Sequence, residues 1–352
     1  MEWELLGFIL AGVFSTYLLI FKETVPIPLI NSNKNQRETR FDSIRGLAMI
    51  GIVLIHVHSY FIFFHPNDDL SITLFLSNFS RFSVPIFILS SAVYLKIKPD
   101  YWKSKFKHLI LPYLITSIFG YLLKYQSWDV FELIEFLIFG KVFTPFYFVP
   151  LLVQFYILYY FISKYIEEKK ILNISLFISL VLNLISNFAG FDDLFTKNYQ
   201  PISIFNYIFF FVLGIKINKL QIREKNNKGF ILNVCIVLFF IIIYVFSING
   251  SDFKNHHLVY PLIFLLFSWE VLPLFHPKLN YILIFIGKNS IFIFLLHPFI
   301  IHYMHAIDPY TFGGAIYGYL ITVLLNVGIP CIVAYLFTSQ MGKFLNRPHH
   351  YP

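Results

Sequence analysis

Long apolar runs, separated by short polar or basic segments, follow one another along almost the whole chain. A helix needs about 20 residues to cross a bilayer, and eleven runs are candidates for such spans. These runs are unbroken rather than alternating, which favours helices over the strands of a membrane barrel. The pattern therefore predicts an all-α polytopic membrane protein with about eleven transmembrane helices. The runs lie near Leu5–Phe21, Gly46–Phe64, Leu74–Leu95, Leu109–Leu123, Phe146–Ile162, Ile171–Ile185, Ile202–Ile217, Phe230–Phe246, Leu258–Phe275, Tyr281–Met304 and Gly314–Phe337.

The composition agrees with burial in lipid. Of the 352 residues, 57% are hydrophobic and 13% are charged, whereas an average soluble domain is about 25% charged. The net charge of +8 does not indicate a nucleic-acid partner here, because basic residues of membrane proteins gather on cytoplasmic loops. Cys235 and Cys331 each stand inside an apolar run, so we expect no disulfide and no metal site.

The distribution of basic residues predicts the orientation. With the N-terminus outside, 21 of the 27 Lys and Arg residues fall in segments assigned to the cytoplasm and 4 fall in outside segments. Such an asymmetry places the C-terminus in the cytoplasm. The first run lacks the basic start of a signal peptide, because no Lys or Arg precedes Lys22. We therefore expect a multi-pass plasma-membrane protein with a retained N-terminal helix at residues 1–22, a membrane domain at 37–340 and a short cytoplasmic tail at 341–352.

The densest polar signal leads directly into the second run. Asp42 and Ser43 are suited to cap that helix, and Asp42 is one turn from Arg45, so the two can pair. His56 follows Arg45 by eleven residues, which puts both on one helix face with His56 about 16 Å deeper. A cation and an imidazole on one face are costly in lipid. This face is therefore predicted to line a protein interior or a watery cavity.

The alternative for His56 is a purely structural histidine that bonds a neighbouring helix. The shared face with Arg45 favours a functional role over that alternative. His58 lies about 200° around the same helix, and His65 follows in an outside loop. We interpret these two histidines as non-catalytic.

Six segments in order resemble the membrane-bound acyltransferase family 3, and together they span Arg37–Phe337. Ten of the eleven predicted spans then belong to the part that resembles the family, and the N-terminal helix is an additional span. Ser91 replaces a glycine of the family pattern, and Lys105 and His108 replace two arginines, which weakens any bidentate grip on a phosphate or carboxylate there. The segments are Arg40-x-Asp42-x-x-Arg45-Gly46 with His56, Ser80–Ser90, Lys105–His108 before Pro112-Tyr113, Pro145–Val149, Phe209–Gly214 and Ile286–Pro298.

The resemblance implies acyl transfer from cytoplasmic acyl-CoA, usually acetyl-CoA, to a hydroxyl of an extracytoplasmic polysaccharide or lipid-linked glycan. No permanently bound cofactor is implied, and polysaccharide-synthesis machinery is a candidate partner. His56 is expected to be the general base or the acyl carrier, since imidazole titrates near neutral pH. The site residues implied are catalytic His56, Arg45 and Asp42, substrate-binding Arg81, His297, Ser290 and Tyr147, and CoA-binding Arg40, Lys105, Lys107 and His108.

Other interpretations of the same residues stay open. The stretch Phe146–Ser163 is similar to a family branch of the intercellular-adhesin type, for which a polysaccharide exporter or translocase, or an O-succinyltransferase, is the alternative function. A transporter is expected to show repeated or interrupted helices, and no clear internal repeat is visible. Positive-inside topology alone also accounts for any single loop lysine. His297 has a structural alternative too, because the following Pro298 frees an upstream carbonyl that a histidine can satisfy.

Overall fold

The computed structural model describes residues 34–65, 71–126, 129–188, 200–219, 258–272, 275–309 and 315–345. Within these ranges the chain forms helices and no strand, which confirms the predicted all-α class. Six helical segments are long and apolar enough to cross a membrane, and a bent pair of helices raises the number to seven. They are Thr39–Phe63, Thr73–Val93, Tyr101–Tyr125, Thr144–Ile162, Lys169–Ser186 and Ile316–Leu336, with Pro277–Lys288 plus Ser290–Met304 as the bent pair.

Part of the predicted topology lies outside the described residues. This holds for the runs near Leu5–Phe21 and Phe230–Phe246, for the helix at 1–22 and for the tail beyond Leu345. The total of eleven spans and the orientation of the termini therefore stay predictions. Two further predicted runs, Ile202–Ile217 and Leu258–Phe275, contain helices of only 12 and 13 residues, shorter than a bilayer requires.

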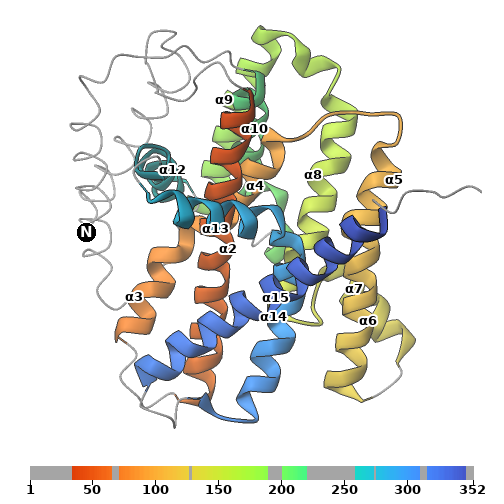
Figure 1. The fold of residues 1–352 in the computed structure, drawn as a ribbon. Coiled ribbons are helices and arrows are strands. Elements are labelled where there is room, and N and C mark those ends of the chain that lie inside the picture. Colours follow the sequence, from red (N-terminus) through yellow and green to blue (C-terminus); the bar gives the residue numbers. More distant parts are fainter. Residues whose placement is uncertain are drawn as a thin grey trace, which may run out of the picture.

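Figure 1 shows the arrangement of the described helices. They are α2 (Lys34–Phe64), α3 (Ser71–Phe79), α4 (Ser83–Val93), α5 (Tyr101–Lys105), α6 (Leu111–Tyr125), α7 (Val130–Phe139), α8 (Phe148–Ile162), α9 (Lys169–Phe188), α10 (Ile208–Lys219), α12 (Val259–Val271), α13 (Pro277–Lys288), α14 (Ser290–His305) and α15 (Ala315–Leu345). Short 3₁₀ segments include η1 (Ser80–Phe82), η3 (Thr144–Tyr147), η4 (Tyr165–Glu167), η6 (Gln200–Ile202) and η7 (Ile204–Asn206), and a π-helical turn, η2 (Phe106–Ile110), joins α5 to α6.

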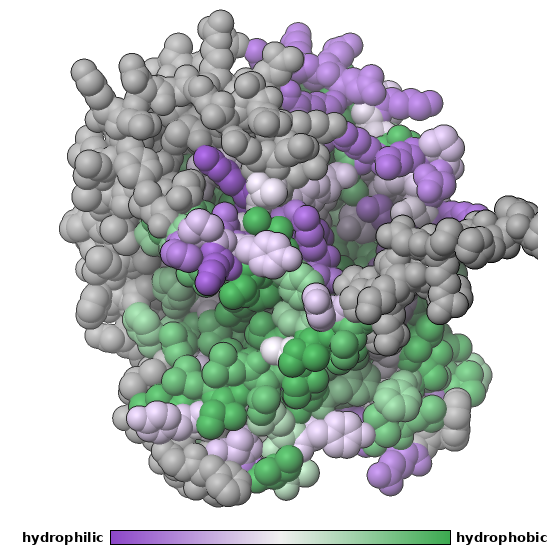
Figure 2. Space-filling view, in the orientation of Figure 1, coloured by the Kyte–Doolittle hydropathy of each residue, from purple (hydrophilic) through white to green (hydrophobic). Residues whose placement is uncertain are grey.

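Helix α2 is the centre of the bundle. It packs against α3, α4, α12, α13, α14 and α15, and η1 also lies against it. A broad hydrophobic surface covers the lower part of the described molecule, and strongly hydrophilic residues gather above it (Figure 2). The N-terminal end of α2 rises towards this hydrophilic side (Figure 1). This arrangement is typical of a membrane-embedded bundle, whose apolar surface faces lipid and whose hydrophilic residues lie outside the bilayer.

Helices α13 and α14 do not form the straight span that the run Tyr281–Met304 predicts. They meet at Asn289 and are bent by 81°. α13 runs across α2 in Figure 1, and one glycine from each helix permits close contact. A Cβ at Gly46 would lie 2.1 Å from the Leu283 carbonyl oxygen, and a Cβ at Gly287 would lie 1.9 Å from the Asp42 carbonyl oxygen. Glycine at these two positions thus permits the close backbone packing of α13 on α2.

The span Thr73–Val93 is interrupted at its middle by η1. Backbone groups in a membrane need internal partners, and hydroxyl groups supply several of them here. Ser80 donates to the Leu76 carbonyl at 2.7 Å, and Ser83 donates to the Ser80 carbonyl at 2.6 Å. Tyr260 of α12 donates to the Phe79 carbonyl. These bonds make the break tolerable, and the break is where Arg81 lies.

Candidate active site

Two histidines from distant parts of the chain meet beside α2. The ring centroids of His56 in α2 and His297 in α14 are 5.6 Å apart, with 37° between the ring planes. His297 is fully buried, while His56 keeps partial exposure. Within the described ranges His56 has no hydrogen-bond partner. The arrangement leaves an imidazole that a substrate can reach, with a second imidazole behind it.

The following proline fixes the hydrogen bonding of His297. Pro298 has no N–H, so the carbonyl of Phe294 lacks its usual helical donor. The His297 ring bonds backbone carbonyls at this position, with Nδ1 at 3.2 Å from the Ile293 oxygen. Donation from Nδ1 leaves Nε2 as an acceptor. That Nε2 is buried and has no partner among the described residues.

Arg81 joins this pair from η1. Its charge acts electrostatically on both His56 and Tyr147, the latter from η3 before α8. Tyr147 also shares a side-chain hydrogen bond with Tyr207, which lies just before α10. The close contact between α2 and η1 sets the position of Arg81. A Cβ at Gly51, five residues before His56, would lie 3.3 Å from the Cβ of Ser80.

Arg45 lies on the His56 face of α2, nearer to the N-terminal end of the helix. One of its guanidinium nitrogens donates to the Ser91 hydroxyl at 3.1 Å, and the group stands 4.9 Å from the centre of the Phe87 ring. Its Nε is buried without a partner in the described part of the chain. Lys105 lies close enough to interact electrostatically with Arg45, and its Nζ is 4.0 Å from the centre of the Tyr156 ring.

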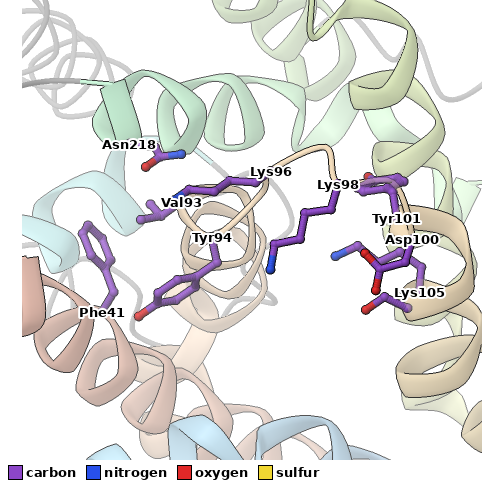
Figure 3. Close-up of a pocket in the computed structure, with 10 residues that line it drawn as sticks. Phe41, Val93, Tyr94, Lys96, Lys98, Asp100, Tyr101, Lys105 and Asn218 are labelled. Atoms are coloured by element: carbon purple, nitrogen blue, oxygen red, sulfur yellow. The ribbon is translucent and has the colours of Figure 1, made fainter.

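A pocket of about 310 Å³ opens beside this basic cluster. Lys96, Lys98 and Lys105 line it together with aromatic and polar side chains (Figure 3). Figure 3 shows the Lys98 ammonium group between Tyr94 and the residues of α5. A pocket with several ammonium groups and aromatic walls suits an anionic ligand that carries a ring. The complete lining is Phe41, Val93, Tyr94, Lys96, Lys98, Asp100, Tyr101, Ser104, Lys105 and Asn218.

The predicted CoA-binding residues differ in how well they fit this pocket. Lys105 lines it, but Lys107 and His108 are exposed and are not part of its lining. The π-helical turn holds His108 in a bond between its Nδ1 and the Ser104 carbonyl at 2.9 Å. Arg40 stands 5.2 Å from the centre of the Trp269 ring. The sequence alone does not single out Lys96 and Lys98, because positive-inside topology accounts equally well for lysines in such a loop.

Asp42 does not take the position predicted for it. α2 begins at Lys34, so Asp42 and Ser43 lie inside the helix and do not cap it. Asp42 accepts a hydrogen bond from the Tyr94 hydroxyl at 3.1 Å, while Arg45 donates to Ser91 and not to Asp42. Tyr94 belongs to the lining of the lysine-lined pocket, so Asp42 lies next to that pocket.

Ser290 and the two histidines that we interpret as non-catalytic, His58 and His65, each have different surroundings. Ser290 is buried at the first residue of α14, two turns before His297 on the same helix face. His58 is buried on another face of α2, and its Nδ1 is 3.0 Å from the Thr73 hydroxyl. His65 is 3.0 Å from an Asp308 carboxylate oxygen and stacks on Phe61. His58 and His65 thus have structural partners, whereas His56 faces His297.

A family model described as an acyltransferase domain, acyltransferase 3, matches residues 38–335. The chain belongs to this acyltransferase family. The match includes every described residue of the site, from Arg40 to His297. It agrees with the resemblance found in the sequence segments, and with a multi-pass membrane protein.

Curated relatives of this acyltransferase 3 protein have names that refer to export. A protein of Staphylococcus aureus strain N315 is 26% identical over 340 residues, with 85% of this chain and 94% of the relative covered. A protein of Staphylococcus epidermidis is 27% identical over 331 residues, with 84% and 92% covered. Both relatives are named as probable poly-beta-1,6-N-acetyl-D-glucosamine export proteins. No solved structure gives a significant match.

Proposed function

We propose that this protein is a membrane O-acyltransferase that moves an acyl group, most simply acetyl, from cytoplasmic acyl-CoA to a hydroxyl of an extracytoplasmic polysaccharide. The observation that carries the proposal is the single face of α2. It has a lysine-lined pocket and Arg45 near one end, and the His56–His297 pair about 16 Å deeper. Membership of the acyltransferase 3 family supports the reaction class.

The donor fits the geometry from the pocket inward. The ammonium groups of Lys96, Lys98 and Lys105 suit the phosphates of CoA, and the aromatic walls suit its adenine ring. The extended arm of CoA separates the thioester from the phosphates by a distance comparable to that between Arg45 and His56. The thioester would then reach the histidine pair while the nucleotide stays in the basic pocket.

His56 would act as the general base. A hydroxyl is a weak nucleophile, and an imidazole that removes its proton in the transition state typically accelerates reaction by about 10²–10⁴-fold. Partial exposure leaves His56 accessible to the acceptor, whereas His297 is fully buried behind it. The free Nε2 of His297 suits a role in orienting or relaying the proton of His56.

A polysaccharide exporter is the second candidate, and two observations favour it. The relatives carry export names, and the α13–α14 pair is a bent span of the kind that transporters place at substrate sites. The exporter would move the polymer without changing its covalent structure. The acyltransferase adds an ester that mild base removes.

One comparison separates the two candidates. The surface polysaccharide is purified from cells with and without the gene for this protein and analysed for base-labile esters. The acyltransferase predicts that the polymer is still outside the deletion cells but lacks the ester. Retention of an unchanged polymer inside the deletion cells would support the exporter and contradict the enzyme.

A further inference from the structure

Arg81 has an unusual environment for a charged side chain. It lies in η1, near the middle of the span Thr73–Val93, where an unpaired charge is costly. Within the described ranges no carboxylate pairs with it, and its Nε is buried without a hydrogen-bond partner. A guanidinium held this way keeps its N–H donors available in a medium of low polarity.

The groups around Arg81 indicate what those donors are for. η1 packs closely on α2, because a Cβ at Gly51 would lie 3.3 Å from the Cβ of Ser80. This contact brings Arg81 to the part of α2 that carries His56. Its charge is also close enough to interact electrostatically with His56 and with the Tyr147 hydroxyl, so the three side chains face one region of the site. When a hydroxyl attacks a thioester, negative charge develops on the carbonyl oxygen while the base becomes positive. A fixed cation beside the base is unfavourable for proton uptake, unless that negative oxygen lies between the two.

We infer that Arg81, together with Tyr147, binds the oxyanion of the tetrahedral intermediate formed beside His56. This inference rests on the proposed function and adds a catalytic role for a residue that the sequence indicated only as substrate-binding. Preorganised donors of this kind stabilise the transition state more than the ground state.

The reaction balances with the groups named. The acceptor oxygen bonds the acyl carbon, its proton passes to His56, and the carbonyl electron pair moves onto the oxygen beside Arg81. When the intermediate collapses, the carbonyl re-forms, the C–S bond breaks, and the departing thiolate takes the proton from His56. The products are an ester and free CoA, and no oxidant or further reactant is required.

Two stable CoA analogues test the inference without turnover. S-carboxymethyl-CoA places an anionic oxygen near the carbonyl position, whereas S-acetonyl-CoA has the same length and is neutral. Their dissociation constants are measured with the full-length protein in nanodiscs. We expect S-carboxymethyl-CoA to bind about 10- to 100-fold more tightly, as for a hydrogen bond between charged groups in a buried site.

Variants test whether Arg81 causes the preference for the anionic analogue. Arg81→Gln should remove the preference, and Arg81→Lys should keep part of it because the positive charge remains. Arg45→Gln should weaken both analogues alike, because Arg45 lies next to the pocket for the phosphates. Lys288→Gln, which removes an exposed cation at the end of α13, should change neither constant.

The outcomes separate this inference from the proposed function. Equal binding of the two analogues to the unmodified protein would overturn the oxyanion role, and the acyltransferase proposal would stand. A preference that persists in Arg81→Gln would overturn it as well. If neither analogue binds, the CoA donor itself is wrong and the inference fails with it.

Discussion

Helices α2 and α15 are alike in length and in the hydropathy of their most apolar windows. Each has 31 residues, and their most apolar windows have nearly the same mean hydropathy. Yet 50% of the α2 window is buried within the protein, against 33% for α15. α15 presents large apolar residues such as Leu324, which is 69% exposed, whereas α2 brings Arg45 and His56 to the centre of the bundle.

The difference shows which sequence signals separate a site helix from a lipid-facing helix. Polar residues that share a face, at a spacing of whole turns, mark α2. The surroundings of its glycines also distinguish α2 from α15, but only the structure reveals them. Gly46 of α2 contacts the backbone of α13, whereas Gly328 of α15 has no atom within 4 Å of its Cβ position.

The largest effect is expected for His56→Gln. An amide has a size similar to imidazole but cannot accept a proton near neutral pH, so ester formation should fall by about 10²–10⁴-fold. The measurement is the ester content of the polysaccharide at equal amounts of membrane protein. The matched control is His58→Gln on the same helix, which removes the contact with Thr73 but should keep most activity.

That pair also tests whether α2 is only a scaffold. If His56 were structural, the glutamine would fill a similar space and much of the activity would remain. Full esterification by His56→Gln would contradict the general-base role and would make His297 the next candidate.

The next largest effect is expected for Gly46→Val. The added side chain overlaps the Leu283 backbone, which cannot move aside as a side chain can, and overpacking typically costs 1–3 kcal/mol or more. We expect a large loss of folded protein, measured by fluorescence-detected size exclusion. Gly328→Val in α15 is the control and should fold normally. Equal behaviour of the two variants would show that the α2–α13 contact is not as close as described.

A smaller effect is expected at the basic pocket beside the α2 end. Lys98→Gln and Lys96→Gln should each weaken acetyl-CoA binding by about two- to tenfold, because partly solvated charges contribute modestly. Isothermal titration with the purified protein measures this. Lys103→Gln removes an exposed charge of α5 outside the pocket lining and should leave the affinity unchanged. Equal losses in all three variants would indicate general electrostatic attraction instead of a site.

The sequence predicts those features of the fold and of the candidate site that depend on single helices. The all-α class follows from the apolar runs, and the shared face of Arg45 and His56 follows from their spacing on α2. The run Tyr281–Met304 predicts one straight span through His297, and the bend of 81° at Asn289 makes that path wrong, although His297 does meet His56.

The features that the sequence does not reveal depend on contacts between distant segments. Lys96 and Lys98 resemble ordinary cytoplasmic charges until α4 and α5 bring them together around the pocket. The cap predicted at Asp42 is wrong, because the helix continues back to Lys34 and because Tyr94 supplies the partner of the carboxylate. The break at Arg81 depends on hydroxyl groups, including that of Tyr260, that satisfy carbonyls freed by η1.

Membrane vesicles of opposite orientation test the central claim most directly. Acetyl-CoA labelled in the acetyl group is added to inverted vesicles, which expose the cytoplasmic face, and to right-side-out vesicles. We predict that base-labile label appears on the polysaccharide only in inverted vesicles with the unmodified protein, and not with His56→Gln. Label that appears equally with His56→Gln, or only in right-side-out vesicles, would contradict transfer along the α2 face.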